Sequence, residues 1–149
     1  VQPVLSVAQA GLPQVWRIGP AQYDVARAQA ELSHRSLRLG LRPLSPCHLR
    51  AVRRGGDVLF RWIRRSRLAG EEWEEGEVPL AEEREEYRLD ILASDAVRRS
   101  VRLAAPEYLY GAREIAADFG ADPRTFRLRI AQVSTVFGAG AALERIIHV

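Results

Sequence analysis

The sequence predicts an all-β fold, in which residues 41–149 form an antiparallel β-sandwich with one short helix and residues 1–40 form a small irregular β segment. Three observations support this fold. Segments in which apolar and polar residues alternate recur along residues 41–149, and they amount to about seven strands at the spacing of a sandwich. A proline-rich stretch around Pro43 and Pro46 marks the start of this region. Glycine-containing turns separate several of its strands.

Residues 1–40 contain short patterns and no obvious core. Residues 15–18 predict a short strand that Gly19-Pro20 ends, and residues 36–39 alternate again. The alanine-rich residues 23–32 predict a turn or two of helix. Because no apolar set here is large enough to stand alone, we expect this segment to be the end of a preceding domain or a linker.

The strands of the sandwich begin after Pro43 and Pro46, since prolines favour extended backbone and interrupt sheet pairing. Residues 48–52 predict the first strand, and Arg54-Gly55-Gly56-Asp57 is typical of a hairpin turn. Residues 58–63 predict the second strand, with Val58, Phe60 and Trp62 on one face. Trp62 is therefore expected to anchor the core.

The remaining elements follow the same logic. Alternation predicts strands at residues 87–91, 97–103 and 126–131, and a last strand at 146–149 after a turn at 138–140. Residues 112–119 predict a short helix, because Ile115 and Phe119 are four residues apart and Gly120 stands where a helix ends.

Charge is distributed in blocks along the chain. All 22 basic residues are arginine, and the formal net charge is +3. Residues 1–69 carry a net charge of +9, residues 70–95 carry −9, and residues 96–149 carry +3. A pI near 9.6 alone would suggest a nucleic-acid partner. The equal acidic block favours internal compensation, and we hypothesise that the segment with Arg61 to Arg67 lies beside the segment 71–86.

Several classes of protein are disfavoured. No stretch reaches the 18 or so apolar residues that span a bilayer, and the N-terminus lacks the pattern of a signal peptide. The single Cys47 cannot form an internal disulfide. Because the chain contains no methionine, we expect it to be processed or a fragment of a longer protein.

The order of these elements resembles a fibronectin type III domain. The features that carry the resemblance are the leading prolines, Trp62 on the second strand, residues 87–91 on the third, and residues 126–134 before the turn at 138–140. The helix at 112–119 departs from the usual pattern of that family. This resemblance implies a fibronectin type III-like sandwich for residues 41–149.

Longer strings resemble the C-terminal region of the tail-hub, or host-specificity, protein of gene transfer agents and related phage tails. They are residues 40–51, 62–67 and 77–80, with 16–20, 117–120 and 130–134 extending the match. The resemblance implies a virion structural protein of the tail tip or baseplate, assembled in the bacterial cytoplasm. Its expected partners are other tail or baseplate proteins, further copies in a homotrimer, and a receptor or glycan on the recipient cell. The TIM-barrel-like domain of that family is not contained in these residues.

Two charged runs are the main candidates for chemistry. The glutamates at 71–77 and 82–86 could supply the carboxylate pair of a glycosidase, but that chemistry needs one carboxylate in a buried environment. A solvated loop facing an arginine-rich neighbour is the better interpretation. The arginines at 61–67 suit phosphate or carboxylate recognition, yet the nearby aromatic residues fit the core better than a stacking platform.

The candidate interaction surface comprises Arg61, Arg64, Arg65, Arg67, Tyr108 and Tyr110. The two tyrosines either lie exposed in a loop after Pro106, where they would suit a protein interface, or cap the sandwich. Metal ligation is disfavoured because the chain offers only Cys47 and three scattered histidines. We therefore expect a binding module, neither an enzyme nor a cofactor protein, with no direct contact to nucleic acid. A nucleic-acid-binding or carbohydrate-binding β module is the alternative.

Overall fold

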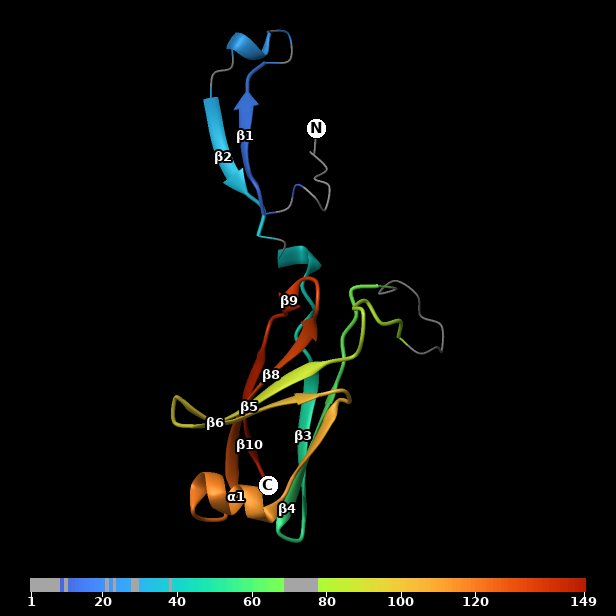
Figure 1. Ribbon diagram of the computed structural model, residues 1–149, viewed down its shortest axis with the longest axis vertical. Helices are drawn as coiled ribbons and strands as arrows, with labels where there is room; N and C mark the ends of the chain where they lie inside the picture. Colours follow the sequence, from blue (N-terminus) through green and yellow to red (C-terminus); the bar gives the residue numbers. More distant parts are fainter. Residues whose placement is uncertain are drawn as a thin grey trace. The chain divides into compact units, whose positions relative to one another are not determined.

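The computed structural model describes residues 9, 11–20, 22, 24–27, 30–37, 39–68 and 78–149. The chain divides into two compact units, Val1–Leu41 and Arg42–Val149. Both units can be followed in Figure 1.

The first unit contains a two-stranded antiparallel ribbon. Strand β1 (Pro13–Ile18) pairs with β2 (Ala30–Arg35), so that Trp16 lies opposite Leu32. Short 3-10 turns occupy Val25–Arg27 and Leu39–Leu41. Residues 23–32, for which a turn or two of helix is expected, contain the 3-10 turn at Val25–Arg27, and the chain enters β2 at Ala30. Pairing with β1 overrides the helix preference of alanine, and no described residue of either strand is buried.

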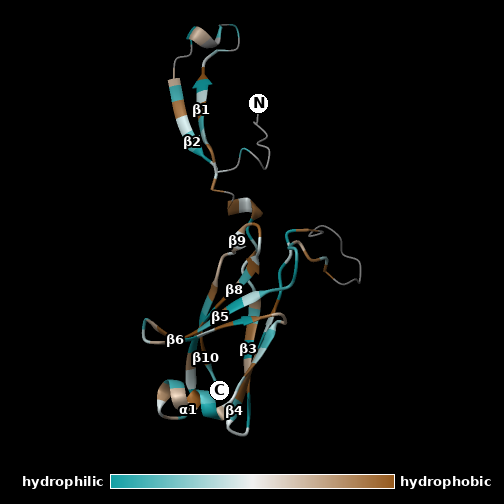
Figure 2. Ribbon diagram, in the orientation of Figure 1, coloured by the Kyte–Doolittle hydropathy of each residue, from teal (hydrophilic) through white to brown (hydrophobic). Residues whose placement is uncertain are grey.

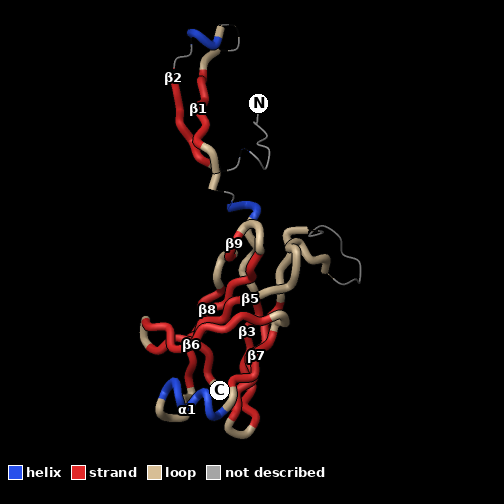
Figure 3. The backbone as a smooth tube through the Cα atoms, viewed as in Figure 1, coloured by secondary structure: helices blue, strands red, loops and turns tan. Residues whose placement is uncertain are grey.

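The second unit is a β-sandwich of two antiparallel sheets, seen as red strands in Figure 3. The smaller sheet has the order β3–β4–β7, and the larger has the order β10–β8–β5–β6, with β9 paired to the end of β8. The strands are β3 (Cys47–Arg54), β4 (Asp57–Ile63), β5 (Tyr87–Ala93), β6 (Ala96–Leu103), β7 (Glu107–Tyr110), β8 (Thr125–Ser134), β9 (Gly138–Ala139) and β10 (Leu143–His148).

The topology confirms the predicted fold class. If the two-residue β9 is set aside, the first, second and fifth strands of this unit form one sheet, and the fourth, third, sixth and seventh form the other. This is the strand order of a fibronectin type III domain. The predicted all-β, fibronectin type III-like sandwich with one short helix is therefore what the chain forms.

Hydrophobic and hydrophilic residues alternate along these strands (Figure 2), and the buried hydrophobic side chains pack together between the two sheets. Phe126 on β8 lies at the centre of an aromatic cluster, with its ring centroid 5.5 Å from that of Phe60 and 5.9 Å from that of Tyr110. Trp62 is only 4 % exposed and meets the Tyr87 ring edge-to-face at 5.3 Å. Trp62 is thus the core anchor that the sequence predicts.

Helix α1 (Ala112–Phe119) has the bounds that the sequence predicts and connects the two sheets, following β7 and preceding β8. It lies at the same end of the sandwich as the β3–β4 turn (Figure 1). Its first turn is held by Asp57, whose carboxylate accepts a hydrogen bond from the backbone N–H of Ala112 at 2.8 Å. Gly120 ends the helix with a φ of 68°, which glycine adopts without strain.

The backbone near Gly140, before the last strand of the sandwich, contacts the backbone at Pro43, before the first strand. The N–H of Ala141 donates to the carbonyl oxygen of Pro43 at 3.3 Å, and the N–H of Gly140 donates to Gln132 at 2.9 Å. A Cβ atom at Gly140 would overlap the Pro43 carbonyl group. We expect Gly140→Ala to lower the free energy of unfolding by about 1–3 kcal/mol, measured by urea denaturation.

The matched control for this substitution is Gly40→Ala, because an added Cβ there meets no atom within 4 Å. The control is expected to change stability by less than about 0.5 kcal/mol. Equal stability of the two variants would contradict the close approach of the backbone at Gly140.

Candidate functional site

The four arginines of the predicted interaction surface point to different places. Arg61 lies on the outward face of β4 and forms an ion pair with Glu107 at 2.9 Å, with both side chains at least half exposed. Arg65 is exposed and forms no side-chain hydrogen bond or ion pair with the residues that the structure describes. Arg64 and Arg67 instead fold back onto the connection that leads from β4 to β5. The structure therefore does not gather these side chains into one basic patch.

Arg67 binds a buried carboxylate. Its Nη2 atom donates to Glu82 Oε1 at 3.2 Å, and the side chain of Glu82 is only 1 % exposed. On the other carboxylate oxygen, Glu82 accepts a hydrogen bond of 2.6 Å from Gln132 Nε2, which belongs to β8. This three-residue network fastens the β4–β5 connection to the centre of the larger sheet.

These contacts correct part of the interpretation of the acidic run. The run was expected to be a solvated loop facing an arginine-rich neighbour. Arg67 is such a neighbour, but Glu82 and Glu86 are each buried to 7 % exposure. They are tolerated there because guanidinium and amide donors satisfy both carboxylates. The glutamates at 71–77 lie outside the described residues.

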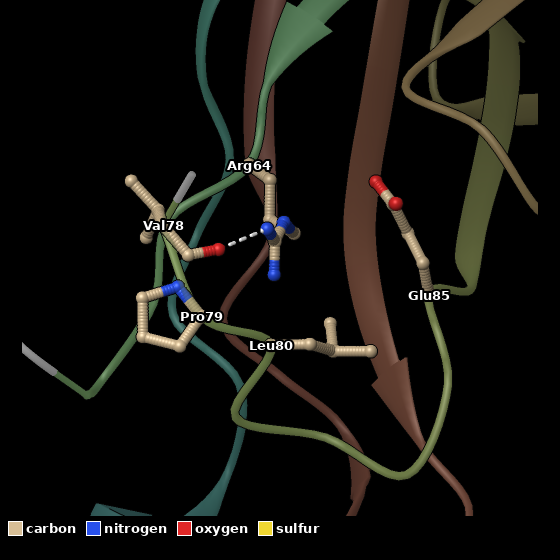
Figure 4. A pocket seen from close by; sticks show the side chains of 5 residues that line it. All are labelled: Arg64, Val78, Pro79, Leu80 and Glu85. Carbon is tan, nitrogen blue, oxygen red and sulfur yellow. Dashed lines mark hydrogen bonds between the residues drawn. The ribbon is translucent and has the colours of Figure 1, made fainter. Parts of the chain in front are cut away.

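Arg64 lines a pocket of about 300 Å³ together with Val78, Pro79, Leu80 and Glu85. Its Nη2 atom donates to the carbonyl oxygen of Val78 at 2.5 Å, drawn as a dashed line in Figure 4. Glu85 stands on the opposite side of the pocket from Val78 and Pro79 (Figure 4). Glu85 Oε1 accepts a hydrogen bond from the Tyr87 hydroxyl at 2.6 Å. Burial, aided by this carboxylate, raises the pKa of Tyr87 far above its ordinary value.

Several buried polar atoms around this pocket and network have no hydrogen-bond partner within the described part of the chain. On the donor side they are Trp62 Nε1, Arg64 Nη1 and Arg67 Nε, and on the acceptor side Gln132 Oε1. Unpaired buried groups of this kind cost free energy, and native proteins contain few of them. One of these atoms, Arg64 Nη1, belongs to a residue that lines the pocket, and we take this pocket as the candidate functional site. Sequence patterns do not reveal it, because Arg64 and Glu85 are 21 residues apart.

Tyr108 and Tyr110 are not exposed in a loop. They lie on β7, opposite Phe60 and Val58 of β4, and Tyr110 is completely buried. The alternative that they cap the sandwich is the correct one, because the Tyr108 hydroxyl donates to Glu114 and the Tyr110 hydroxyl to Asp118, both on α1. Burial and the nearby Glu114 carboxylate raise the pKa of Tyr108 to about 12. The prediction that Tyr108 and Tyr110 belong to an accessible interaction surface is therefore wrong, because both residues hold β7 to α1.

Arg99 on β6 completes this cluster. Its guanidinium group donates to Asp118 at 2.6 Å and to Glu114 at 2.8 Å, and lies 5.7 Å from the centroid of the Tyr110 ring. The network fastens α1 to both sheets, since Arg99 belongs to the larger sheet and Tyr110 to the smaller. The hydrogen bond from Arg99 holds the pKa of Asp118 below its ordinary value of 3.8.

This pKa shift predicts an acid sensitivity. A carboxylate whose pKa is lower in the folded state stabilises the fold fully above its unfolded pKa, and the contribution is lost as pH falls through the folded value. We therefore expect the free energy of unfolding to fall below about pH 4, and to fall less steeply in Asp118→Asn. Urea denaturation at several pH values measures both slopes.

Asp95→Asn is the matched control for that titration, since the side chain of Asp95 is 94 % exposed although it pairs with Arg127. It is expected to change the free energy of unfolding by less than about 1 kcal/mol, because exposed ion pairs contribute little. Identical slopes for all three proteins would show that Asp118 does not contribute to the acid response.

The outward faces of the two sheets differ. On the larger sheet, arginines share carboxylates: Glu144 accepts from Arg127 and Arg129, and Glu86 pairs with Arg84 and Arg102. On the smaller sheet, Val52, Leu59 and Leu109 stand opposite one another and form an apolar row. The ion pair of Arg61 and Glu107 borders this row.

No group of three or more histidine, cysteine, aspartate or glutamate side chains that could hold a metal ion occurs among the described residues. Cys47 is a free thiol of intermediate exposure at the start of β3. Within the same part of the chain, no helix is long and apolar enough to cross a membrane.

Comparison with known proteins gives structural likenesses only. No protein-family model and no curated protein matches the chain. The extracellular region of rat CD45, domains d3–d4, is 6 % identical with a TM-score of 0.49, covering 100 % of this chain and 69 % of that one. The spore cortex lytic enzyme SleM of Clostridium perfringens is 10 % identical with a TM-score of 0.46, covering 72 % of this chain and 28 % of that one.

Proposed function

We propose that this chain is a structural and interaction module of a phage-like tail tip, part of a tail-hub or host-specificity protein in the baseplate of the virion. In this role the module docks neighbouring tail subunits or contacts the surface of the recipient cell. It acts by binding and without catalysis, and three copies surround the tail axis. The resemblance of residues 40–51, 62–67 and 77–80 to the tail-hub family supports the proposal.

The observation that carries the docking role is the apolar row on the smaller sheet. Val52 and Leu109 are 55 % and 51 % exposed, and Leu59, which lies opposite both of them on β4, is 6 % exposed. Arg50, Arg61 and Glu107 form the adjacent row. An apolar centre with a charged border is the composition of a protein interface, whereas the outward face of the larger sheet is covered by ion pairs.

Site-specific photo-crosslinking in assembled particles tests this role. A benzophenone amino acid in place of Leu109 is expected to crosslink to another tail subunit or to a second copy of this chain, identified by mass spectrometry. The matched control is the same substitution at Val97, which is 48 % exposed on β6 of the other sheet. Absence of tail proteins among the Leu109 products, or equal products from Val97, would contradict docking through the smaller sheet.

A further inference from the structure

The Arg64 pocket has the chemistry of a small ligand site. We propose that it binds a single neutral sugar ring, with one hydroxyl group accepting from Arg64 and another donating to Glu85. This inference deepens the proposed function, because it gives a module at the recipient-cell surface a ligand of defined chemistry. It rests on the proposed function for its biological setting, whereas the binding itself follows from the residues that line the pocket.

On the donor side of the pocket, the Arg64 guanidinium group is held in one orientation and has one N–H group without an acceptor among the described residues. The Arg64 guanidinium is held in place by its 2.5 Å hydrogen bond to the Val78 carbonyl oxygen. Its Nη1 atom is buried and has no acceptor within the described residues. A buried guanidinium N–H without an acceptor is costly, and a ligand oxygen placed beside it removes that cost. Within the described residues, the Nη1 atom of Arg64 therefore remains a donor that no protein acceptor uses.

The acceptor side is oriented as well. Glu85 is fixed by the hydrogen bond that its Oε1 atom accepts from Tyr87 at 2.6 Å. A carboxylate has about four acceptor positions, so this contact leaves capacity for a ligand hydroxyl. Among the described residues Arg64 donates to the Val78 carbonyl oxygen and Glu85 accepts from Tyr87, so each group has a partner other than the opposite charge. Figure 4 shows the two charged groups on separate sides of the pocket. A ligand that bridges them must therefore donate at one end and accept at the other.

The balance of charge selects a neutral ligand. An anion at Arg64 would be repelled by Glu85, and a cation at Glu85 would be repelled by Arg64. A hydroxyl group both donates and accepts, so a ring that carries several hydroxyl groups satisfies both sides at once. This argument also disfavours phosphate groups, and hence nucleic acid, as occupants.

The remaining walls select a ring in preference to an amide side chain. Val78, Pro79 and Leu80 contribute apolar side chains to a lining that also contains polar groups, with Val78 and Leu80 at 51 % and 36 % exposure. The C–H face of a sugar ring covers such a surface, while the amide of asparagine or glutamine offers little apolar area beyond its polar atoms. A volume of about 300 Å³ lies at the lower end of small-molecule sites, which suits one ring.

Titration of the full 149-residue chain tests the pocket. The probes are methyl glucoside, methyl mannoside and methyl galactoside, with N-acetylneuraminic acid as the anionic comparison and acetamide as the amide comparison. Two-dimensional ¹H–¹⁵N NMR follows the backbone amides of Leu80 and Glu85. We expect at least one neutral glycoside to shift these signals in a saturable way, and the two comparison compounds to bind more weakly.

Variants assign the binding to named groups. Arg64→Gln is expected to weaken the bound glycoside roughly tenfold or more, since one charged hydrogen bond is lost. Glu85→Gln, an independent change on the opposite wall, is expected to weaken it as well and serves if Arg64→Gln does not fold. Arg65→Gln, an exposed neighbour that does not line the pocket, is the matched control and should bind as the wild type does.

Three outcomes would overturn the inference: no neutral glycoside shifts these signals, the anionic or amide compound binds better, or the folded pocket variants bind as tightly as the wild type. Because the titration uses the isolated chain, its failure leaves the tail location untouched. A chain that binds glycosides but is absent from tails would instead contradict the proposed function alone.

Discussion

Phe126→Ala is expected to lower the free energy of unfolding by about 3–5 kcal/mol, a large part of the stability of a domain of this size. Phe126 is completely buried and meets three aromatic rings, with Phe119 of α1 at 5.7 Å in addition to Phe60 and Tyr110. Its loss leaves a cavity where both sheets and the helix converge. Urea denaturation followed by tryptophan fluorescence measures the change, because Trp62 stays in place.

Leu109→Ala is the control for that experiment. Leu109 belongs to β7 like Tyr110, but its side chain is 51 % exposed on the outward face. Its truncation is expected to cost less than about 1 kcal/mol. A small effect of Phe126→Ala, comparable to that of Leu109→Ala, would show that the aromatic cluster is not the centre of the core.

Glu82→Ala has the second largest expected effect. The substitution removes the carboxylate that Arg67 and Gln132 share, and leaves both donors buried without that partner. Breaking a buried, hydrogen-bonded charge pair costs about 3 kcal/mol or more. The β4–β5 connection should also become sensitive to proteolysis, since the network fastens it to β8. Limited trypsin digestion together with urea denaturation measures both consequences.

Glu107→Ala is the matched control, since Glu107 also pairs with an arginine, Arg61, but at the surface. Exposed ion pairs contribute little, so this variant should lose less than about 1 kcal/mol. Similar losses for the two glutamates would contradict the distinction between a buried network at Glu82 and a surface pair at Glu107.

Elements that depend on nearby residues could be predicted from the sequence. Helix α1 was predicted with its observed bounds, because the spacing of Ile115 and Phe119 and the stop at Gly120 are local signals. Strand β8 and the β3–β4 turn likewise follow from alternation and from glycine. The fold class followed from the spacing of such elements along the chain.

Features that depend on distant partners could not be predicted in this way. Strand β7 is four residues long and exists because β4 pairs with it, so its own alternation is too short to identify it. The burial of Glu82 depends on Gln132, which is 50 residues away. The candidate pocket arises only when the connection after β4 folds back over Arg64. Arginine spacing alone suggested a single patch, but the structure places Arg61 on the outward face of β4 and the other three arginines in the connection that follows this strand.

The most direct test of the proposed role is to locate this chain in an intact particle. The site for an epitope tag is the β3–β4 turn, between Gly55 and Gly56, because both residues are exposed and lie outside the two strands. Electron microscopy of phage-like particles with gold-labelled antibody should place the label at the distal end of the tail. Label on the head or along the tail shaft, or particles without label although the tagged chain is expressed, would contradict the tail-tip assignment.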